Sequence, residues 1–421
     1  MKVLAAHNYY QQAGGEDGVF HDETALLESH GDEVIRYSVR NDELREEGIL
    51  RRAALAAGTV WNRQSYAGIR RLIRRERPDV MHVHNTLPLL SPAIYRAARA
   101  EGVAVVHTLH NYRILCSGAL LFRDGHVCEE CVGARFAVHG IRHRCYRNSA
   151  GASAAVALTT GIHWGLKTWT DTVNRYISMT DFGKSRFVAG GLPEEKIAVK
   201  PHFVRNAPPR GNGNGSYFLY VGRLTADKGI NVLLAAWRLQ RSGLRLKIVG
   251  DGPERENVQT AAAEMAGVDV LGRMGAADVF ELMQGARAVV VPSLWYETFG
   301  RVVTEAFACG TPVIVSDIGA LAELVQDGRT GFRFTAGNPD QLAGVMNRFG
   351  ADAAWERPLR DAAYAQYVER YTPDRNYVEL MSIYRDAMRD AAGDNASNGS
   401  DIGKPAKTDD AVSPGNRFGG T

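Results

Sequence analysis

Short apolar runs rich in β-branched residues recur along the chain and alternate with longer segments whose apolar residues follow a helical period. Runs of this kind are typical of parallel strands buried on both faces, and their alternation with helical segments predicts an α/β fold. We therefore expect two doubly wound parallel sheets of Rossmann-like type, one in each half of the chain. The predicted strands lie at 3–6, 33–37, 80–83, 103–108 and 176–179, and at 217–222, 246–249, 268–271, 286–291 and 311–315.

A segment rich in Pro, Gly and Asn separates the two sets of strands and is the obvious linker between domains. The chain of 421 residues also exceeds the size at which a single hydrophobic core stops growing, about 250 to 300 residues. A final tail, dominated by small and polar residues, is expected to be disordered. The predicted parts are an N-terminal domain (1–201), a linker (202–216), a C-terminal domain (217–372), a last helix (373–392) and the tail (393–421).

Charge is nearly balanced, with 50 Lys and Arg against 47 Asp and Glu, which argues against nucleic acid as the main partner. Arginines nevertheless crowd one predicted helix between Arg63 and Arg77, where apolar residues recur at helical spacing. Such a helix fits an anionic membrane surface. More commonly it is a surface helix with an apolar core face and a solvated basic face.

The chain shows no signal-peptide pattern at its first residues and no apolar run that approaches about 18 residues. We therefore expect a cytoplasmic protein, with peripheral association at the inner face of the cytoplasmic membrane as an open alternative. In that compartment its five cysteines are expected to be reduced thiols or metal ligands and not disulfides.

The segment 291–316 places two carboxylates, Glu297 and Glu305, around the start of a predicted helix between two buried strands. Loops that follow parallel strands meet at the carboxyl edge of the sheet, where ligands of open α/β folds bind. The two glutamates lie eight residues apart, about two helical turns, so both can face one elongated ligand. Taken alone, the pair fits a solvated helix face equally well.

A second candidate loop, 220–230, also follows a strand and opens a helix, so backbone N–H groups point at whatever lies above the sheet. A phosphate is the natural occupant of such a helix start. Arg223 and Lys228 add two cations there, which can neutralise a departing diphosphate without a metal ion. The alternative is a surface loop with scattered charges.

Three weaker signals lie at other predicted strand ends. Gly250 and Gly252 would allow a ligand close to the backbone, although a turn that needs left-handed backbone angles explains them nearly as well. Arg273 fits a nucleotide contact or a plain strand-end arginine. The Gly14-Gly15 loop after the first strand would face the second domain across a cleft, or is simply a flexible loop.

His110 ends a buried strand on the same predicted rim and is either structural or a site residue. Taken together, these features resemble, in order and spacing, the family 4 (group 1) glycosyltransferases of GT-B fold, in which two such domains face a cleft. The resemblance extends from Met1 to about Ala392 and is most specific in the C-terminal domain. It is carried by Gly14-Gly15, His110, Gly222-Arg223 to Lys228-Gly229, Gly250-Asp251-Gly252, and Glu297 to Glu305 followed by Ala-Cys-Gly-Thr-Pro-Val-Ile.

This resemblance implies a retaining transfer of a sugar from a nucleoside-diphosphate sugar, without a required cofactor, to a glycan or lipid-linked acceptor in cell-surface glycan synthesis. It implies that His110, Arg223, Lys228 and Glu297 act in catalysis. Arg223 and Lys228 would hold the diphosphate, Glu297 the sugar hydroxyls, and Glu305 the ribose. Further donor contacts are implied for Gly14, Gly15, Gly222, Gly250, Asp251, Gly252, Arg273, Phe299, Gly300 and Arg301.

A cysteine-rich insertion at about 113–146 departs from the core of the predicted N-terminal domain. Four cysteines in a reduced compartment match the ligand count of a closed tetrahedral zinc site, although the spacings are not those of a common finger. Structural zinc and unligated reduced thiols both remain open, with His126 and His143 as substitute ligands. The cysteines are Cys116, Cys128, Cys131 and Cys145.

Competing functions share this predicted fold. A sugar-nucleotide epimerase or a phosphorylase-like enzyme is the nearest enzymatic alternative, and a catalytically silent sugar-nucleotide sensor is the alternative from another class. The intact set of Arg223, Lys228, Glu297 and Glu305 argues against a silent protein. The base and sugar of the donor, the acceptor and the linkage are not specified by these patterns.

Overall fold

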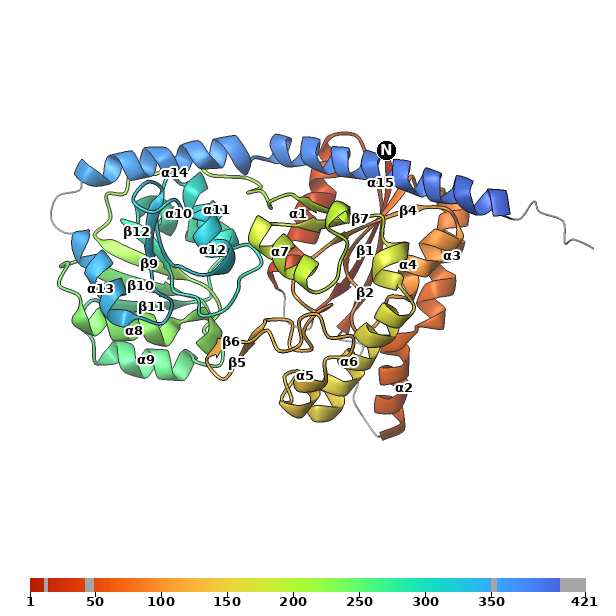
Figure 1. The fold of residues 1–421 in the computed structure, drawn as a ribbon. Coiled ribbons are helices and arrows are strands. Elements are labelled where there is room, and N and C mark those ends of the chain that lie inside the picture. Colours follow the sequence, from red (N-terminus) through yellow and green to blue (C-terminus); the bar gives the residue numbers. More distant parts are fainter. Residues whose placement is uncertain (11–13, 42–48, 350–353, 402–421) are drawn as a thin grey trace, which may run out of the picture.

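A computed structural model describes residues 1–10, 14–41, 49–349 and 354–401 of the chain. Two parallel sheets of six strands each dominate it, joined by the segment that follows the first sheet (Figure 1). Helices cover both faces of each sheet, which buries the central strands and explains the apolar runs in their sequences. The expected pair of doubly wound sheets is therefore present.

The first sheet has the strand order β2-β1-β3-β4-β7-β8. Its order reverses between β1 and β3, which places a switch point where the loops after these strands diverge. The five expected strands of this half are present, and β8 is an additional edge strand. Its strands are β1 (Lys2–Tyr9), β2 (Glu33–Arg40), β3 (Val80–Asn85), β4 (Ala104–Thr108), β7 (Arg175–Ser178) and β8 (Ile197–Val199).

Helices cover this sheet, and a hairpin interrupts it after β4. The hairpin pairs β5 (Phe122–Arg123) with β6 (His126–Val127) inside the cysteine-rich insertion. The helices are α1 (Gly15–Ser29), α2 (Ile49–Val60), α3 (Arg63–Glu76), α4 (Ala93–Ala100), α5 (Val138–Arg142), α6 (Ala150–Gly165) and α7 (Asp181–Ala189), with a π-helical turn at Thr168–Thr172 and a 3₁₀ turn at Glu194–Lys196.

The second sheet has the strand order β11-β10-β9-β12-β13-β14, so its switch point lies between β9 and β12. The five expected strands are present, and β14 is an additional edge strand. The strands are β9 (Tyr217–Val221), β10 (Arg245–Val249), β11 (Val268–Gly272), β12 (Ala288–Val291), β13 (Val313–Ser316) and β14 (Gly331–Phe334); the helices are α8 (Ile230–Leu239), α9 (Arg255–Ala263), α10 (Ala276–Gly285), α11 (Arg301–Ala308), α12 (Gly319–Leu324) and α13 (Pro339–Arg348), with 3₁₀ turns at Ala226–Lys228 and Ala354–Glu356.

The chain returns to the first sheet after it completes the second. Helix α14 (Arg357–Arg370) packs against α11, and α15 (Pro373–Asp401) then crosses to the first sheet, as Figure 1 shows in blue. Leu380, Tyr384 and Ala387 of α15 are fully buried against strands β1, β3 and β4. The helix runs to Asp401, past Ala392, where we expected it to end.

The apolar stripe of the arginine-rich helix α3 faces the protein interior. Ile69 and Ile73 are buried in the core of the first domain, and Tyr66 packs against the same core. Arg70 and Arg74 both form ion pairs with Glu101. The structure therefore favours the surface-helix interpretation of α3, because its apolar face is already covered by protein.

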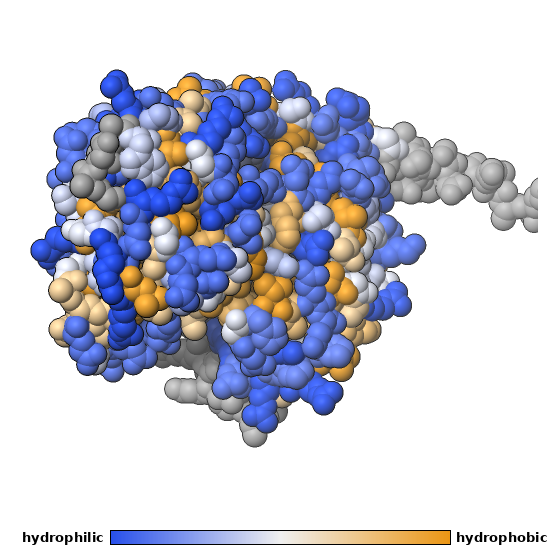
Figure 2. Space-filling model, turned by 60° about the vertical axis from the view of Figure 1, so that its left-hand side comes forward, coloured by the Kyte–Doolittle hydropathy of each residue, from blue (hydrophilic) through white to orange (hydrophobic). Residues whose placement is uncertain are grey.

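No helix among the described residues combines the length and the apolar character needed to cross a membrane. Figure 2 shows the face on which the second domain comes forward, where apolar residues are scattered among hydrophilic ones.

Candidate functional site

Three loops interlock at the carboxyl edge of the second sheet. The N–H of Gly222, after β9, donates to the carbonyl of Val249, and the N–H of Gly250, after β10, donates to the carbonyl of Gly272, the last residue of β11. A Cβ on Gly250 would lie 1.8 Å from the carbonyl oxygen of Gly222, and its φ of +146° is one that other residues rarely adopt. Gly250 is therefore required for the approach of two backbones, whatever it contributes to a ligand.

Lys228 and Glu297 meet at this edge. The Lys228 ammonium donates to Oε1 of Glu297 at 2.6 Å, and the Ser293 hydroxyl donates to the same oxygen at 2.7 Å. The ammonium also lies 5.0 Å from the ring centroid of Trp295, a cation–π distance. The Glu297 carboxylate is buried and oriented by these donors, while the Lys228 side chain remains 27% exposed toward the edge.

The backbone holds the two loops that carry Lys228 and Glu297 together. The N–H of Leu294 donates to the carbonyl of Asp227 at 2.8 Å. Gly229 closes against Pro292, whose carbonyl oxygen would lie 1.8 Å from a Cβ on Gly229. The expected cation and the expected carboxylate, 69 residues apart in sequence, are therefore fixed side by side.

Helix α11 begins at the next part of the same edge. Gly300, at φ +110°, precedes it, and Arg301 is its first residue. Glu305 lies one turn further along, with its carboxylate 3.6 Å from the Arg301 guanidinium. Burial raises the pKa of Glu305, and the charge of Arg301 lowers it in part. The second expected carboxylate therefore lies in a partly enclosed position beside the helix start.

Arg301 also reaches the first domain. Its guanidinium donates to the carbonyl of Gly15 at 3.2 Å and to the Asp22 carboxylate at 3.1 Å. The Gly14-Gly15 turn begins helix α1, and the Gly14 N–H donates to the Asp17 carboxylate at 2.9 Å. The glycine loop of the first domain therefore faces the start of α11 in the second, as its sequence position suggested.

His110 lies on the opposite wall, at the end of β4. Thr298, in the loop that carries Glu297, donates to the His110 carbonyl at 2.8 Å. The His110 imidazole is hydrogen-bonded to that of His84 at 3.0 Å, and its ring stacks near that of His202 at 5.4 Å. Burial and the neighbouring histidines hold the pKa of His110 well below its usual range, so the ring is neutral.

A cavity opens beside His110 within the first domain. It is bounded by the loops that follow β3 and β4 and by the inner face of α6. Polar groups from all three elements face it next to His110. Its lining includes His84, Asn85, Asn111, Arg113, Thr159 and Thr160.

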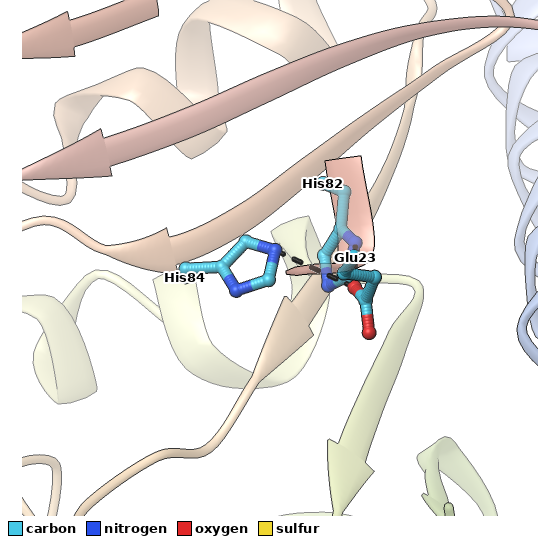
Figure 3. Close-up of side chains that lie close together, drawn as sticks. All are labelled: Glu23, His82 and His84. Carbon is cyan, nitrogen blue, oxygen red and sulfur yellow. Dashed lines mark ion pairs between the residues drawn. The ribbon is translucent and has the colours of Figure 1, made fainter. Parts of the chain in front are cut away.

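Glu23, His82 and His84 form a buried cluster behind His110 (Figure 3). Nδ1 of His82 lies 3.2 Å from Oε1 of Glu23, and Nε2 of His84 lies 3.5 Å from the same oxygen. The His82 ring is already hydrogen-bonded on both nitrogens, to Tyr384 at 2.7 Å and to Thr108 at 2.8 Å. Since no ring nitrogen of His82 remains for a metal, the cluster fits a hydrogen-bonded network and not a metal site.

Lys200 supplies the positive charge of this network. Its ammonium donates to Oε2 of Glu23 and to the side-chain oxygen of Asn376, each at 3.0 Å. The Lys200 and Glu23 side chains are 1% and 2% exposed. Residues from α1, β3, the segment after β8 and α15 thus join in one buried set, and none of them had been expected from sequence because each is isolated from the others along the chain.

Other expected residues remain at the rim. Arg223 and Arg273 are exposed on the loops after β9 and β11, and Asp251 is exposed after β10, where it accepts from the Gly252 N–H at 2.9 Å. Sequence reasoning missed Glu16, which approaches Asn111 within 3.5 Å across the glycine loop. Burial raises the pKa of Glu16 to about 7.

No disulfide joins the four cysteines of the insertion. Burial raises the pKa of Cys131 to about 11, with further contributions from Cys116, Cys145 and Cys128. Within the described ranges, the groups of three or more potential ligands that lie within 4.8 Å of one another are Glu23, His82 and His84, and Glu130, His139 and His143. The cysteines form no such group, so the zinc interpretation receives no support from their arrangement.

Two facing Rossmann-like domains, with the Lys228–Glu297 pair on one and His110 on the other, define a two-domain protein of GT-B type. Its two halves match two family models: residues 14–206 match Glycosyltransferase Family 4, and residues 206–366 match Glycosyl transferases group 1. The chain belongs to this family of glycosyltransferases.

Curated relatives agree with this assignment. The chain is 30% identical over 332 residues to a D-inositol 3-phosphate glycosyltransferase of Acidothermus cellulolyticus, with 74% of this chain and 67% of that protein covered. It is 29% identical to the glycogen synthase of Mycobacterium tuberculosis, with 70% and 63% covered. It spans 45% of a further relative, an uncharacterized glycosyltransferase of Methanocaldococcus jannaschii that is 34% identical.

Solved structures share the fold at low identity. The Anabaena protein HepE in complex with UDP matches with a TM-score of 0.63 at 18% identity, covering 91% of this chain and 99% of that one. Sucrose-phosphate synthase from Thermosynechococcus elongatus matches with a TM-score of 0.66 at 18% identity, covering 91% and 98%. These similarities establish the GT-B fold of the chain.

Proposed function

We propose that the protein is a retaining glycosyltransferase that moves a sugar from a nucleoside-diphosphate sugar to an acceptor in cell-surface polysaccharide or glycolipid synthesis. The observation that carries the proposal is the buried Glu297 carboxylate, held by Lys228 and Ser293 at the carboxyl edge of the second sheet. Family membership supports it, as do the similar structures solved with UDP and with UDP-glucose.

The donor lies along this edge in the proposal. Lys228 and Arg223 meet the diphosphate, because both are cations beside a strand-to-helix turn. The backbone of Phe299, Gly300 and Arg301 adds the start of α11, where N–H groups are not used within the helix. Glu305, one turn further, accepts from the ribose hydroxyls.

Charge stabilisation is the main catalytic effect we assign. The bond between the sugar carbon and the diphosphate oxygen breaks, and Lys228 and Arg223 stabilise the negative charge that the diphosphate carries away. The oxygen of the acceptor hydroxyl then bonds to the same face of the sugar carbon, and its proton passes to the departing diphosphate. Glu297 is not a nucleophile in this scheme, because its carboxylate is already bound to Lys228 and Ser293 and serves to accept from sugar hydroxyls.

The acceptor enters from the first domain. The cavity beside His110 lies next to the loop that carries Glu297, since Thr298 is hydrogen-bonded to the His110 carbonyl. His110 is neutral, so its imidazole can exchange hydrogen bonds with a sugar without bringing a second positive charge. Closure of the domains around the donor excludes water and suppresses hydrolysis.

A panel of nucleotide sugars tests the proposal. A true donor at about 100 times its dissociation constant stabilises the protein by about 2.7 kcal/mol, which thermal unfolding detects. Glu297→Ala and Lys228→Ala are expected to abolish transfer and to retain the fold, while Lys184→Ala, at a surface ion pair, retains full turnover. Chelation of divalent ions is expected to leave the rate unchanged. Wild-type turnover in the Glu297 or Lys228 variant would contradict the site.

A further inference from the structure

Five large apolar side chains are exposed together on one end of the first domain. They belong to α5, to α6 and to the residues that adjoin these helices, which lie at the end of the domain remote from α15 (Figure 1). We call this set the α5–α6 face. It comprises Phe136 (42% exposed), Val138 (60%), Leu158 (48%), Ile162 (37%) and Leu166 (45%).

The spacing of these residues shows that the face is a continuous stripe. Leu158, Ile162 and Leu166 follow one another at intervals of four residues along α6, so they lie on one side of the helix. Phe136 rests on the same helix, because its ring occupies the space that a Cβ on Gly161 would need. The outer side of α6 is thus apolar, and these side chains remain exposed although α2 and α5 pack along the same helix.

Cations predominate in the segment that carries this stripe. From Cys131 to Thr170 the sequence contains no Asp or Glu, while Arg135, Arg142, Arg144, Arg147 and Lys167 all have exposed side chains. Glu130, the last carboxylate before this segment, is paired with Arg123 at 2.9 Å. An apolar stripe in a segment whose acidic and basic residues are all Arg and Lys is the pattern of a surface that binds an anionic bilayer.

We propose that the α5–α6 face docks on an anionic lipid bilayer. A second copy of the chain fits less well, because a symmetric contact through this face would bring its cations against the same cations of the partner. The stripe on α3 cannot serve instead, since Ile69 and Ile73 are buried.

Docking on this face would place the acceptor cavity one helix away from the membrane. Thr159 and Thr160 line the cavity beside His110, and they adjoin Leu158 and Ile162 on the opposite side of the same helix. An acceptor whose lipid portion remains in the bilayer could therefore reach His110 with its polar head. This second part of the inference rests on the proposed function, and it names the acceptor class as lipid-linked.

Co-sedimentation of the full chain with vesicles tests the docking. Wild-type protein is expected to bind vesicles with about 30% anionic phospholipid, to bind neutral phosphatidylcholine vesicles weakly, and to dissociate at about 500 mM salt. Each arginine near an anionic surface contributes about a fivefold gain in partitioning, so Arg142→Ala with Arg144→Ala is expected to reduce binding about 30-fold. Leu158→Ser with Ile162→Ser is expected to reduce it by at least roughly tenfold.

A matched control removes exposed apolar residues elsewhere. Leu239→Ser with Leu271→Ser, at 43% and 40% exposure in the second domain, is expected to leave vesicle binding unchanged. Equal binding of the α5–α6 variants and wild type, or equal binding to neutral vesicles, would overturn the proposal. Self-association of the wild type that these variants abolish, without any vesicle binding, would assign the face to a second copy and overturn it as well.

The failure of docking can be told from failure of the proposed function. Release of nucleoside diphosphate from the donor with water or a soluble acceptor measures the catalytic site without a bilayer. Variants of the α5–α6 face are expected to retain this release and the thermal shift with donor, and to lose transfer only to an acceptor held in vesicles. If these variants lose nucleoside-diphosphate release and transfer to the vesicle-held acceptor equally, the inference of a lipid-linked acceptor is contradicted. The docking on a bilayer is then decided by the co-sedimentation result alone.

Discussion

Lys200→Met is the change that most directly tests the buried network joining α15 to the first domain. Lys200 and Glu23 are 1% and 2% exposed and lie 3.0 Å apart, and Lys200 also donates to Asn376 of α15. Methionine keeps most of the length of the side chain and removes its charge. The variant leaves the Glu23 carboxylate buried without its cation and Asn376 without its donor.

The expected loss follows from the burial of the pair. Removal of one partner of a buried ion pair costs about 3 to 5 kcal/mol, because the remaining charge is left without compensation. For a domain of about 200 residues, each kcal/mol lowers Tm by about 2 to 4 °C, so we expect a fall of roughly 6 to 20 °C. Thermal unfolding followed by circular dichroism measures it.

Two further variants decide the cause of this loss. Lys184→Met removes a surface ion pair with Glu194 at 3.8 Å and is expected to cost less than about 1 kcal/mol. Glu23→Gln combined with Lys200→Met is expected to be less destabilised than the sum of the two single changes, with a coupling of at least about 1 kcal/mol. A Tm for Lys200→Met within about 3 °C of wild type, or additive single effects, would refute the reasoning.

Two other predictions follow from particular residues. Gly250→Ala is expected to destabilise the second domain by more than about 2 kcal/mol, since its Cβ would lie 1.8 Å from the Gly222 carbonyl oxygen. Gly243→Ala, at φ +75° with nothing within 4 Å, is the control and is expected to cost only about 1 kcal/mol. Equal Tm values for the two variants would contradict the loop contact. The pKa of Glu16 is about 7 in the fold against an ordinary value of 4.5, so its contribution to stability is full below pH 4.5 and is lost as pH rises through 7. Glu16→Gln is therefore expected to flatten the decrease of Tm between pH 5 and pH 8, and an unchanged slope would disprove the shift.

The central strands were predictable because a strand buried on both faces has an apolar run in its sequence. Runs such as 288–291 are apolar at every position, since helices cover both sides of a parallel strand. The strands β8 and β14 were missed because they are short edge strands, with only partial burial or a mixed pattern. The two-residue strands of the hairpin β5–β6 are too short for any period to show.

The candidate site was predictable where a residue and its structural setting share one short segment. Lys228 follows a strand and begins a helix within a few residues, and Glu297 lies in a loop of the same kind. Their direct hydrogen bond was not predictable, because it depends on the contact of Leu294 with Asp227 and of Gly229 with Pro292. The same holds for Thr298 and the His110 carbonyl, which come from different domains.

The sequence by itself determined the two α/β halves, the residues at their strand ends and the family to which they correspond, because these follow from local periodicity and from motifs within single segments. Only the tertiary structure decided which side chains meet. It buried the apolar face of α3 and left that of α6 exposed, and it joined Glu23, Lys200 and Asn376 across more than half of the chain. Burial and pairing of this kind depend on how the elements pack, and the local sequence around a residue does not specify its partner from a distant segment.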